Sequence, residues 1–307
     1  MIEEFGIPRT KPEKISHLLH LYIDGGIDRR TMFRRLVRLT GGATAAMATL
    51  ESEGLAQESR PACPDNIKVS ETDPAVTWSD VTYPGEAGSC MGLLARPSGQ
   101  TDPQPAVIVI HENRGLTEHI RDVTRRVAKA GFVALGVDLL ARQGGSGAFP
   151  NDTARGQAYG RTVANERYND IYSAIEYLHR QDFVIRDRIG AIGFCVGGGD
   201  IYYGIFNNMP LQAAVPFYGT PPNPIPDNAV TTPVLAIFSE TDRNQAARIP
   251  ALATALVNAR VTFEIHLYKG TGHGFHNDTG AIYNPAAACL AWDKSIRFFN
   301  TILRAPA

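Results

Sequence analysis

The stretch GAIGFCVGGGD, residues 190–200, decides how this sequence is interpreted. It places Cys195 between glycines, directly after the short apolar run RIGAIGF of residues 188–194. Glycines remove the side chains that would clash in a sharp turn, so the pattern predicts a strand, a strained turn at the cysteine and then a helix. There the sulfur lies above a sheet at a helix N-terminus, where the dipole and free amides favour a thiolate. The plainer alternative is a buried structural thiol in a glycine-rich turn.

Apolar runs of strand length alternate with amphipathic helical patterns on both sides of this stretch. From about residue 76 onward, the alternation predicts an α/β fold, a mostly parallel sheet with helices on both faces. The expected strands are residues 106–112, 132–140, 188–194, 213–219, 233–240 and 262–270, preceded by an antiparallel pair at 75–84 and 90–97. The expected helices are residues 120–130, 168–179, 246–257 and 286–302. Functional residues of such sheets gather at the carboxyl ends of the strands.

Composition favours a small molecule as the binding partner. The 307 residues include 30 basic and 31 acidic side chains, for a net charge of -1. No global field therefore attracts the chain to nucleic acid or to an anionic membrane. With 44% hydrophobic residues the chain can bury a sizeable core without help from disulfides. The oligomeric state does not follow from these totals.

The four cysteines, Cys63, Cys90, Cys195 and Cys289, are too scattered for a disulfide scaffold or for a zinc site with paired ligands. Only Cys63 and Cys90 are close enough in sequence for a pairing to be considered. No metal and no cofactor is expected.

The first 60 residues differ from the rest of the chain and are treated as a separate segment, with a catalytic domain over 61–307. Five arginines between Arg29 and Arg38 precede the weakly apolar run of residues 39–50, which is too short to span a membrane. One interpretation is a twin-arginine export signal with GLAQ, residues 54–57, as a cleavage region, which would place the protein in the periplasm. The other, slightly favoured, is a retained helical extension on a cytoplasmic protein, because apolar residues recur at helical spacing.

An acid and a histidine follow Cys195 in the chain order of a nucleophile, acid and base triad. Asp242 comes directly after the expected strand at 233–240, and His273 follows the expected strand at 262–270. Asp242 could instead cap a helix. His273 lies between glycines in a loop, where a histidine has little packing role. His276 completes an H-x-x-H pair with it, but no further ligands follow zinc spacings.

The segment HENRG, residues 111–115, ends the first central strand. It lacks the second histidine of a metalloprotease helix. In a hydrolase with a nucleophile turn, this position supplies one backbone amide of the oxyanion hole, and the residue after the nucleophile supplies the other. These amides would belong to Asn113 and Val196. Glu112 would then direct its carboxylate toward Cys195.

Together, GFCVGGG, the acid at Asp242, GHGFHND, HENRG and DLLARQGG resemble the dienelactone hydrolase family of the α/β-hydrolase superfamily, over about residues 76–304. The resemblance implies the α/β-hydrolase fold and a cysteine nucleophile. It also implies that Glu112 helps to generate the thiolate and that Arg142 binds a substrate carboxylate. We expect Tyr218 and His276 to contact substrate as well.

Two positions depart from the family pattern. Asn277 stands where well-known dienelactone hydrolases carry a second carboxylate-binding arginine, and Gly274 replaces a serine. A single arginine clamps an anion less well than two. The substrate is therefore left open.

The expected function is hydrolysis of a small ester or lactone, of the carboxymethylenebutenolidase type, through an acyl-enzyme on Cys195. One alternative is a broad carboxylesterase with a different, neutral substrate. Another is a redox or transferase enzyme that uses the thiol, although no resolving cysteine lies nearby in sequence. A third is a binding protein on the hydrolase fold that has lost catalysis, which fold alone never excludes.

Overall fold

The computed structural model describes residues 10–12, 14, 15, 18, 19, 29–52, 67–226 and 230–305. It divides into two compact units, residues 1–62 and residues 63–307, and each unit is described by itself.

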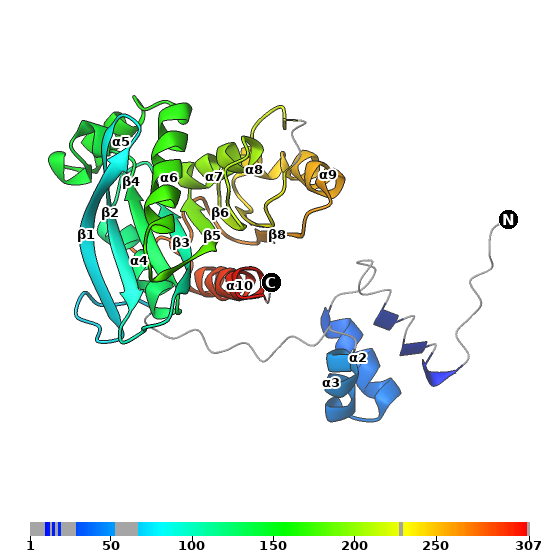
Figure 1. Cartoon of the computed structure of the whole chain (residues 1–307). Helices are drawn as coiled ribbons and strands as arrows, with labels where there is room; N and C mark the ends of the chain where they lie inside the picture. The colour runs from blue at the N-terminus through cyan, green and yellow to red at the C-terminus, as the bar shows by residue number, and fades with distance from the viewer. Residues whose placement is uncertain are drawn as a thin grey trace. The chain divides into compact units, whose positions relative to one another are not determined.

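In the first unit, helices α2 (Arg29–Thr40) and α3 (Ala43–Ser52) pack around a small apolar core (Figure 1). Its buried members are Leu18, Leu19, Met32, Leu36 and Ala46. Three arginines of α2 are exposed: Arg34, Arg35 and Arg38. Residues 54–57, the cleavage region considered above, lie outside the described residues. Within the described residues, none of the helices combines the length and hydropathy needed to cross a membrane.

The second unit is built on an eight-stranded mixed sheet of described residues, in the order β1-β2-β4-β3-β5-β6-β7-β8. The strands are β1 (Val76–Gly85), β2 (Gly88–Pro97), β3 (Gln104–Ile110), β4 (Val133–Asp138), β5 (Val184–Phe194), β6 (Ala213–Phe217), β7 (Val234–Ser239) and β8 (Phe263–Tyr268). Strand β2 is antiparallel to both β1 and β4, and every other neighbouring pair is parallel. The expected antiparallel lead-in pair and the parallel sheet are thus confirmed.

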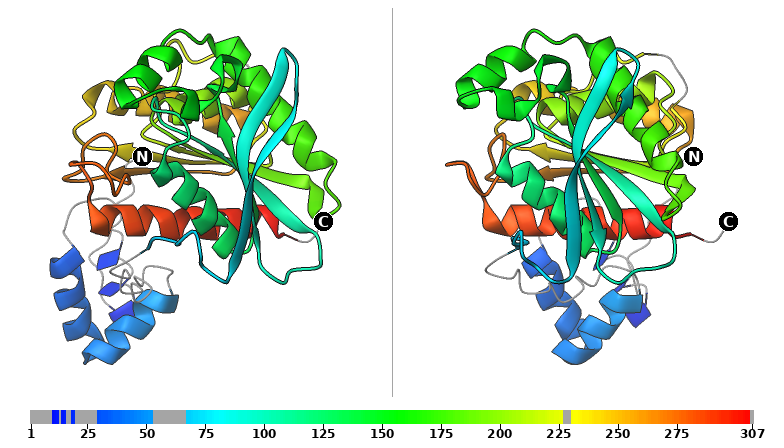
Figure 2. Two further views of the ribbon diagram at one scale, coloured as in Figure 1. Left: turned by 90° about the vertical axis from the view of Figure 1, so that its left-hand side faces the viewer. Right: turned by 60° about the vertical axis from the view of Figure 1, so that its left-hand side comes forward.

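Helices cover both faces of this sheet (Figures 1 and 2). The elements are α4 (Glu118–Lys129), the short 3-10 turns at residues 141–143 and 146–148, α5 (Asp152–Tyr159), α6 (Ala164–His179), α7 (Val196–Phe206), α8 (Arg243–Ala246), α9 (Ile249–Ala259) and α10 (Pro285–Leu303). Helices α6, α7 and α9 pack against one face, and α4 and α10 against the other. Side chains alternate along β3. Ile108 packs on the face covered by α6, α7 and α9, and Val107 and Val109 pack on the face covered by α4 and α10. Such double coverage explains why the central strands are continuous apolar runs.

The boundaries differ from expectation where local sequence is a weak guide. Strand β5 begins at Val184, four residues before the expected strand, where Gln104 pairs with Val184 ahead of a register shift. Helix α9 begins only at Ile249 because Pro250 falls in its first turn, where a proline needs no hydrogen-bonding partner. Helix α5 was not expected. It is short, and its start is capped by the side chain of Asn151, which accepts from the amide of Ala154 at 2.9 Å.

Candidate active site

The turn at Cys195 has the strained geometry that its sequence predicts. Cys195 joins β5 to α7 with φ 57° and ψ -116°, a region that residues other than glycine rarely adopt. Its amide donates to the carbonyl of Phe217 at 3.0 Å, which ties the turn to β6. A Cβ on Gly197 would lie only 2.6 Å from the carbonyl oxygen of His111. The glycine therefore lets the start of α7 approach the end of β3.

A buried histidine fixes the loop that follows β3. The Nδ1 atom of His111 lies 2.6 Å from the carbonyl oxygen of Glu112, and its Nε2 lies 3.0 Å from the amide nitrogen of Leu139. Because Nε2 must accept from that amide, the proton belongs on Nδ1 and the ring is neutral. Burial lowers the pKa of His111, which agrees with this state. The histidine thereby holds the backbone at Asn113 in one position.

The backbone amides of Val196 and Asn113, the two amides expected to form the oxyanion hole, lie near the sulfur of Cys195 and favour its thiolate form. The sequence interpretation favoured a thiolate at this helix terminus. The structure indicates the opposite for the resting molecule. Burial of the thiol, followed by the charge of Glu112, raises the pKa of Cys195 to about 11 even though the two amides lower it.

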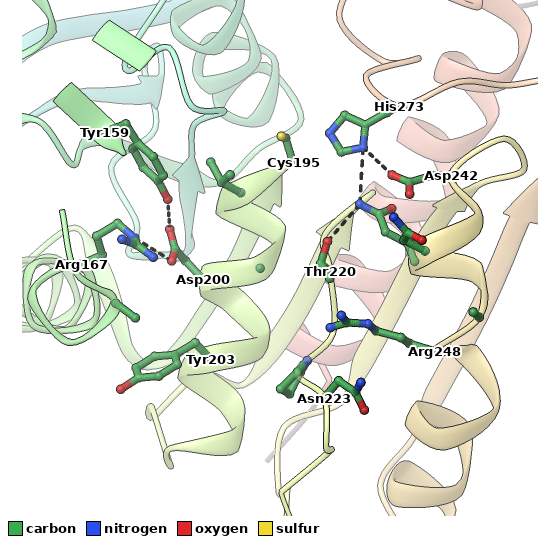
Figure 3. A pocket seen from close by; sticks show the side chains of 17 residues that line it. Tyr159, Arg167, Cys195, Asp200, Tyr203, Thr220, Asn223, Asp242, Arg248 and His273 are labelled. Atoms are coloured by element: carbon green, nitrogen blue, oxygen red, sulfur yellow. Dashed lines mark hydrogen bonds and ion pairs between the residues drawn. The ribbon is translucent and has the colours of Figure 1, made fainter. Parts of the chain in front are cut away.

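His273 and Asp242 meet at the carboxyl ends of β8 and β7. The Nδ1 atom of His273 lies 2.8 Å from Oδ2 of Asp242, and the two side chains are 40% and 19% exposed. His273 lies across the cavity from Cys195 (Figure 3). Asp242 also precedes α8, but its side chain does not cap that helix. An acid that orients a histidine opposite a nucleophilic turn is the arrangement that acyl transfer requires.

Glu112 is held beside this site by two partners. Its carboxylate accepts from the side-chain amide of Asn277 at 2.7 Å and from the hydroxyl of Tyr218 at 3.4 Å. Tyr218 is fully buried, with φ 37°, and its ring lies 5.1 Å from that of His273. Tyr218 therefore contacts both Glu112 and the ring of His273 from a buried position. It does not line the cavity, although it was expected to contact substrate.

A cavity of about 970 Å³ opens beside Cys195 (Figure 3). It lies between α7 on one side and α8 and α9 on the other. Besides Cys195, Asp242 and His273, its polar lining includes Tyr159, Arg167, Asp200, Tyr203, Thr220, Asn223 and Arg248. A volume of this size accommodates a drug-sized ligand.

Arg142 is not brought into this cavity. Its guanidinium forms a two-pronged ion pair with Asp170 on α6, with Nε 2.9 Å from Oδ2 and Nη2 2.8 Å from Oδ1. Asp170 is 5% exposed. The expected contact with a substrate carboxylate is therefore corrected: the charge of Arg142 is already neutralised by a buried partner.

His276 is also placed away from substrate. It is fully buried, its ring stacks 5.0 Å from that of Phe194, and neither ring nitrogen has a hydrogen-bond partner. Two residues later in the same loop, Asp278 accepts hydrogen bonds from His119 and Arg126 of α4. His276 and His273 therefore do not share a site. Among the described residues no group of three or more metal-binding side chains gathers.

Sequence reasoning missed several residues of the site. The side-chain amide of Gln245 lies 3.4 Å from Nδ1 of His273 and donates to the carbonyl of Tyr218 at 2.5 Å. Asp200 accepts from Tyr159 at 2.7 Å and from Nε of Arg167 at 2.8 Å. The position of Asp200 five residues after the cysteine, on the next turn of the same helix, was the available signal.

Two of the cysteines are free thiols. Cys90 is buried and Cys195 partly exposed, whereas Cys289 is disulfide-bonded. Cys90 therefore does not form the disulfide with Cys63 that was considered from sequence. Cys63 itself lies outside the described residues. The thiol of Cys90 packs in the core beside Asp170, and burial raises its pKa to about 11.

A mostly parallel sheet with a strained cysteine turn after β5, an acid after β7 and a histidine after β8 is the architecture of an α/β-hydrolase. Comparison with known proteins narrows this class. Residues 90–303 match the model of the dienelactone hydrolase family, and the chain belongs to that family.

Individual relatives agree with this membership. A candidate carboxymethylenebutenolidase of Synechocystis sp. is 34% identical over 242 residues, which cover 73% of this chain and 96% of that protein. A candidate 2-oxo-3-(5-oxofuran-2-ylidene)propanoate lactonase of Bradyrhizobium sp. is 31% identical, covering 74% of this chain and 94% of that one. The crystal structure of a candidate dienelactone hydrolase from Klebsiella pneumoniae superposes with a TM-score of 0.66 at 26% identity, covering 73% of this chain and 98% of that chain. The chain is thus a hydrolase of this family.

Proposed function

We propose that this hydrolase cleaves a small ester or lactone through a covalent acyl-enzyme on Cys195. The observation that carries the proposal is the 2.8 Å contact between His273 and Asp242 opposite a cysteine whose turn has a positive φ. The names of the relatives, a carboxymethylenebutenolidase and a lactonase, support esters and lactones as the substrate class.

In the proposed acylation step, the substrate binds with its carbonyl oxygen at the amides of Val196 and Asn113, which lie near the sulfur. His273 takes the thiol proton, and Asp242 stabilises the imidazolium that results. The thiolate forms a bond to the carbonyl carbon while the carbonyl electron pair moves to oxygen, which the two amides stabilise. The oxyanion then re-forms the carbonyl as the bond from carbon to the leaving oxygen breaks, and this oxygen takes the proton from His273, which leaves a thioester on Cys195.

In the proposed deacylation step, His273 removes a proton from water, which attacks the thioester carbonyl. The carbon–sulfur bond breaks, the acid leaves, and the returning proton restores the thiol. The charge of Glu112 disfavours the thiolate at rest, so the reactive form is generated only with substrate present.

Turnover of a p-nitrophenyl acetate and of a dienelactone by the wild type and by Cys195→Ala tests the proposal. We expect the variant to lose at least a thousandfold in kcat, because loss of a nucleophile costs several powers of ten. The matched control is Cys90→Ala, which removes the other free thiol and should leave kcat within about twofold. A Cys195→Ala enzyme within about tenfold of wild type would exclude the acyl-enzyme.

A further inference from the structure

One cation in the cavity beside Cys195 has no charged partner among the described residues. The lining contains two arginines, Arg167 and Arg248, and two aspartates, Asp200 and Asp242. Asp242 pairs with His273 at 2.8 Å, and Asp200 pairs with Arg167 at 2.8 Å. Both aspartates thus have other partners, and no carboxylate among the described residues forms an ion pair with Arg248.

The surroundings of Arg248 hold its guanidinium without neutralising it. Arg248 precedes α9, and its Nη1 donates to the carbonyl oxygen of Pro221 on the opposite loop. A carbonyl is a neutral acceptor, and this bond uses one of the five N–H groups of a guanidinium. Figure 3 shows the side chain extending from the α8–α9 segment into the cavity, between Thr220 and Asn223. The remaining donors are thus available to an anion.

By contrast, the charge of Arg167 is compensated by Asp200. Its Nε donates to Asp200, and its Nη1 donates to the hydroxyl of Thr162 at 2.9 Å and to the carbonyl of that residue at 3.2 Å. The second oxygen of Asp200 accepts from Tyr159. This cluster forms a neutral, rigid part of the cavity wall. It does not compete with Arg248 for an anion.

The positions that the family resemblance assigned to carboxylate binding do not supply a cation here. Arg142 is paired with Asp170, and Asn277 carries no charge and donates to Glu112. An anionic substrate would therefore have to be recognised elsewhere in the cavity. Its volume of about 970 Å³ leaves room for a scissile ester at Cys195 and a charged group at a distance from it.

We propose that Arg248 binds a carboxylate on the acyl part of the substrate, so that the preferred substrates are esters of a dicarboxylic acid with one free carboxylate remote from the scissile carbonyl. This inference rests on the proposed function. Arginine suits the role because its planar fork matches a carboxylate. The partly enclosed wall strengthens the contact relative to bulk water.

The test compares pairs of aryl esters that differ only in the terminal charge. The probes are p-nitrophenyl hydrogen adipate against p-nitrophenyl hexanoate, and the suberate half-ester against the octanoate. In the wild type we expect a higher kcat/KM for the charged member of at least one pair. In Arg248→Gln we expect the charged-to-neutral ratio to fall by about 10-fold to 100-fold, as for the loss of a charge-assisted hydrogen bond.

Control variants distinguish failure of the role proposed for Arg248 from failure of the proposed function. Arg243→Gln removes an exposed charge at the first residue of α8 that does not line the cavity, and the charged-to-neutral ratio of this variant should match that of the wild type. A ratio that is unchanged in Arg248→Gln, or equal losses on both members of a pair, would overturn the role of Arg248 and leave a merely structural bond to Pro221. Retention of turnover in Cys195→Ala would instead overturn the proposed function, whatever the ratio.

Discussion

At the scale of single residues, the site combines a strained cysteine with a carboxylate that opposes its ionisation. The amides of Val196 and Asn113 favour the thiolate of Cys195, whereas the charge of Glu112, which is held nearby by Asn277 and Tyr218, opposes it. The chain order of cysteine, aspartate and histidine could be predicted from sequence because each follows a recognisable strand. The state of the thiol could not, because burial depends on the whole fold.

Glu112→Gln should lower the pKa of Cys195 below its value of about 11, because a negative charge that disfavours the thiolate is removed. The oxygen of glutamine can accept from Asn277 and its NH2 group can donate to the hydroxyl of Tyr218, so the geometry should persist. The measurement is the rate of alkylation of Cys195 by iodoacetamide against pH, followed by mass spectrometry of the labelled peptide. The midpoint should move to lower pH, whereas Glu118→Gln, an exposed carboxylate paired with Arg125, should not move it. An unchanged or higher midpoint in Glu112→Gln contradicts the assignment.

At the scale of elements, the start of α7 is packed so closely that only some of its glycines are required. A Cβ on Gly197 would meet two backbone oxygens, those of His111 and Ile110, at 2.6 and 2.7 Å. A Cβ on Gly199 would meet only the carbonyl oxygen of Thr220, at 3.9 Å. In the run Gly197–Gly199, a glycine is therefore sterically required at position 197 but not at position 199. The amino-acid sequence alone does not distinguish these positions.

Gly197→Ala should destabilise the protein by about 1–3 kcal/mol, because backbone oxygens of β3 cannot move aside for a methyl group. Gly199→Ala should be neutral or stabilise by up to about 1 kcal/mol, since alanine favours the helix and finds space. Urea unfolding of the two variants, two residues apart on the same helix, provides the comparison. Equal effects would show that the close approach of α7 to β3 does not constrain the sequence.

At the scale of the whole molecule, the strands and the mostly parallel character of the sheet were predictable from sequence, whereas side-chain pairings across the fold were not. The central strands are apolar runs buried on both faces, a pattern visible in local sequence. Arg142 was expected to bind a substrate carboxylate, yet it pairs with Asp170, 28 residues further along the chain on α6. His276 looked like a loop residue, yet it is buried beside Phe194 of β5 and Trp292 of α10. Such contacts arise from tertiary packing and leave no local signal.

Stability should depend on pH through His276. Burial, His119 and Arg126 lower its pKa well below 6.5, and only Asp278 opposes them. As pH falls below 6.5, the unfolded chain therefore binds a proton at this position that the folded protein does not, and the free energy of unfolding decreases. Asp278, whose pKa is lowered by its partners although burial raises it, adds acid sensitivity only below about pH 3.8.

His276→Phe should reduce the loss of stability between pH 7.5 and 5.5 by about 1.4 kcal/mol, the linkage of one proton over one pH unit. Phenylalanine suits the aromatic surroundings of this position. Urea unfolding at a series of pH values gives the slope, with the value at pH 8 as the baseline of each protein. Identical slopes in the two proteins would assign the acid sensitivity to other groups, such as His111, whose pKa burial also lowers.

The burial of the Cys195 sulfur beside Glu112 has a consequence for resistance to oxidation. Peroxides attack the thiolate rather than the thiol, and a pKa of about 11 leaves a very small thiolate fraction at neutral pH. The fold thus keeps the proposed nucleophile in a form that peroxides attack slowly. Formation of the thiolate during turnover would expose the sulfur to oxidation, so we expect sulfenic acid to form faster on the working enzyme than on the resting enzyme.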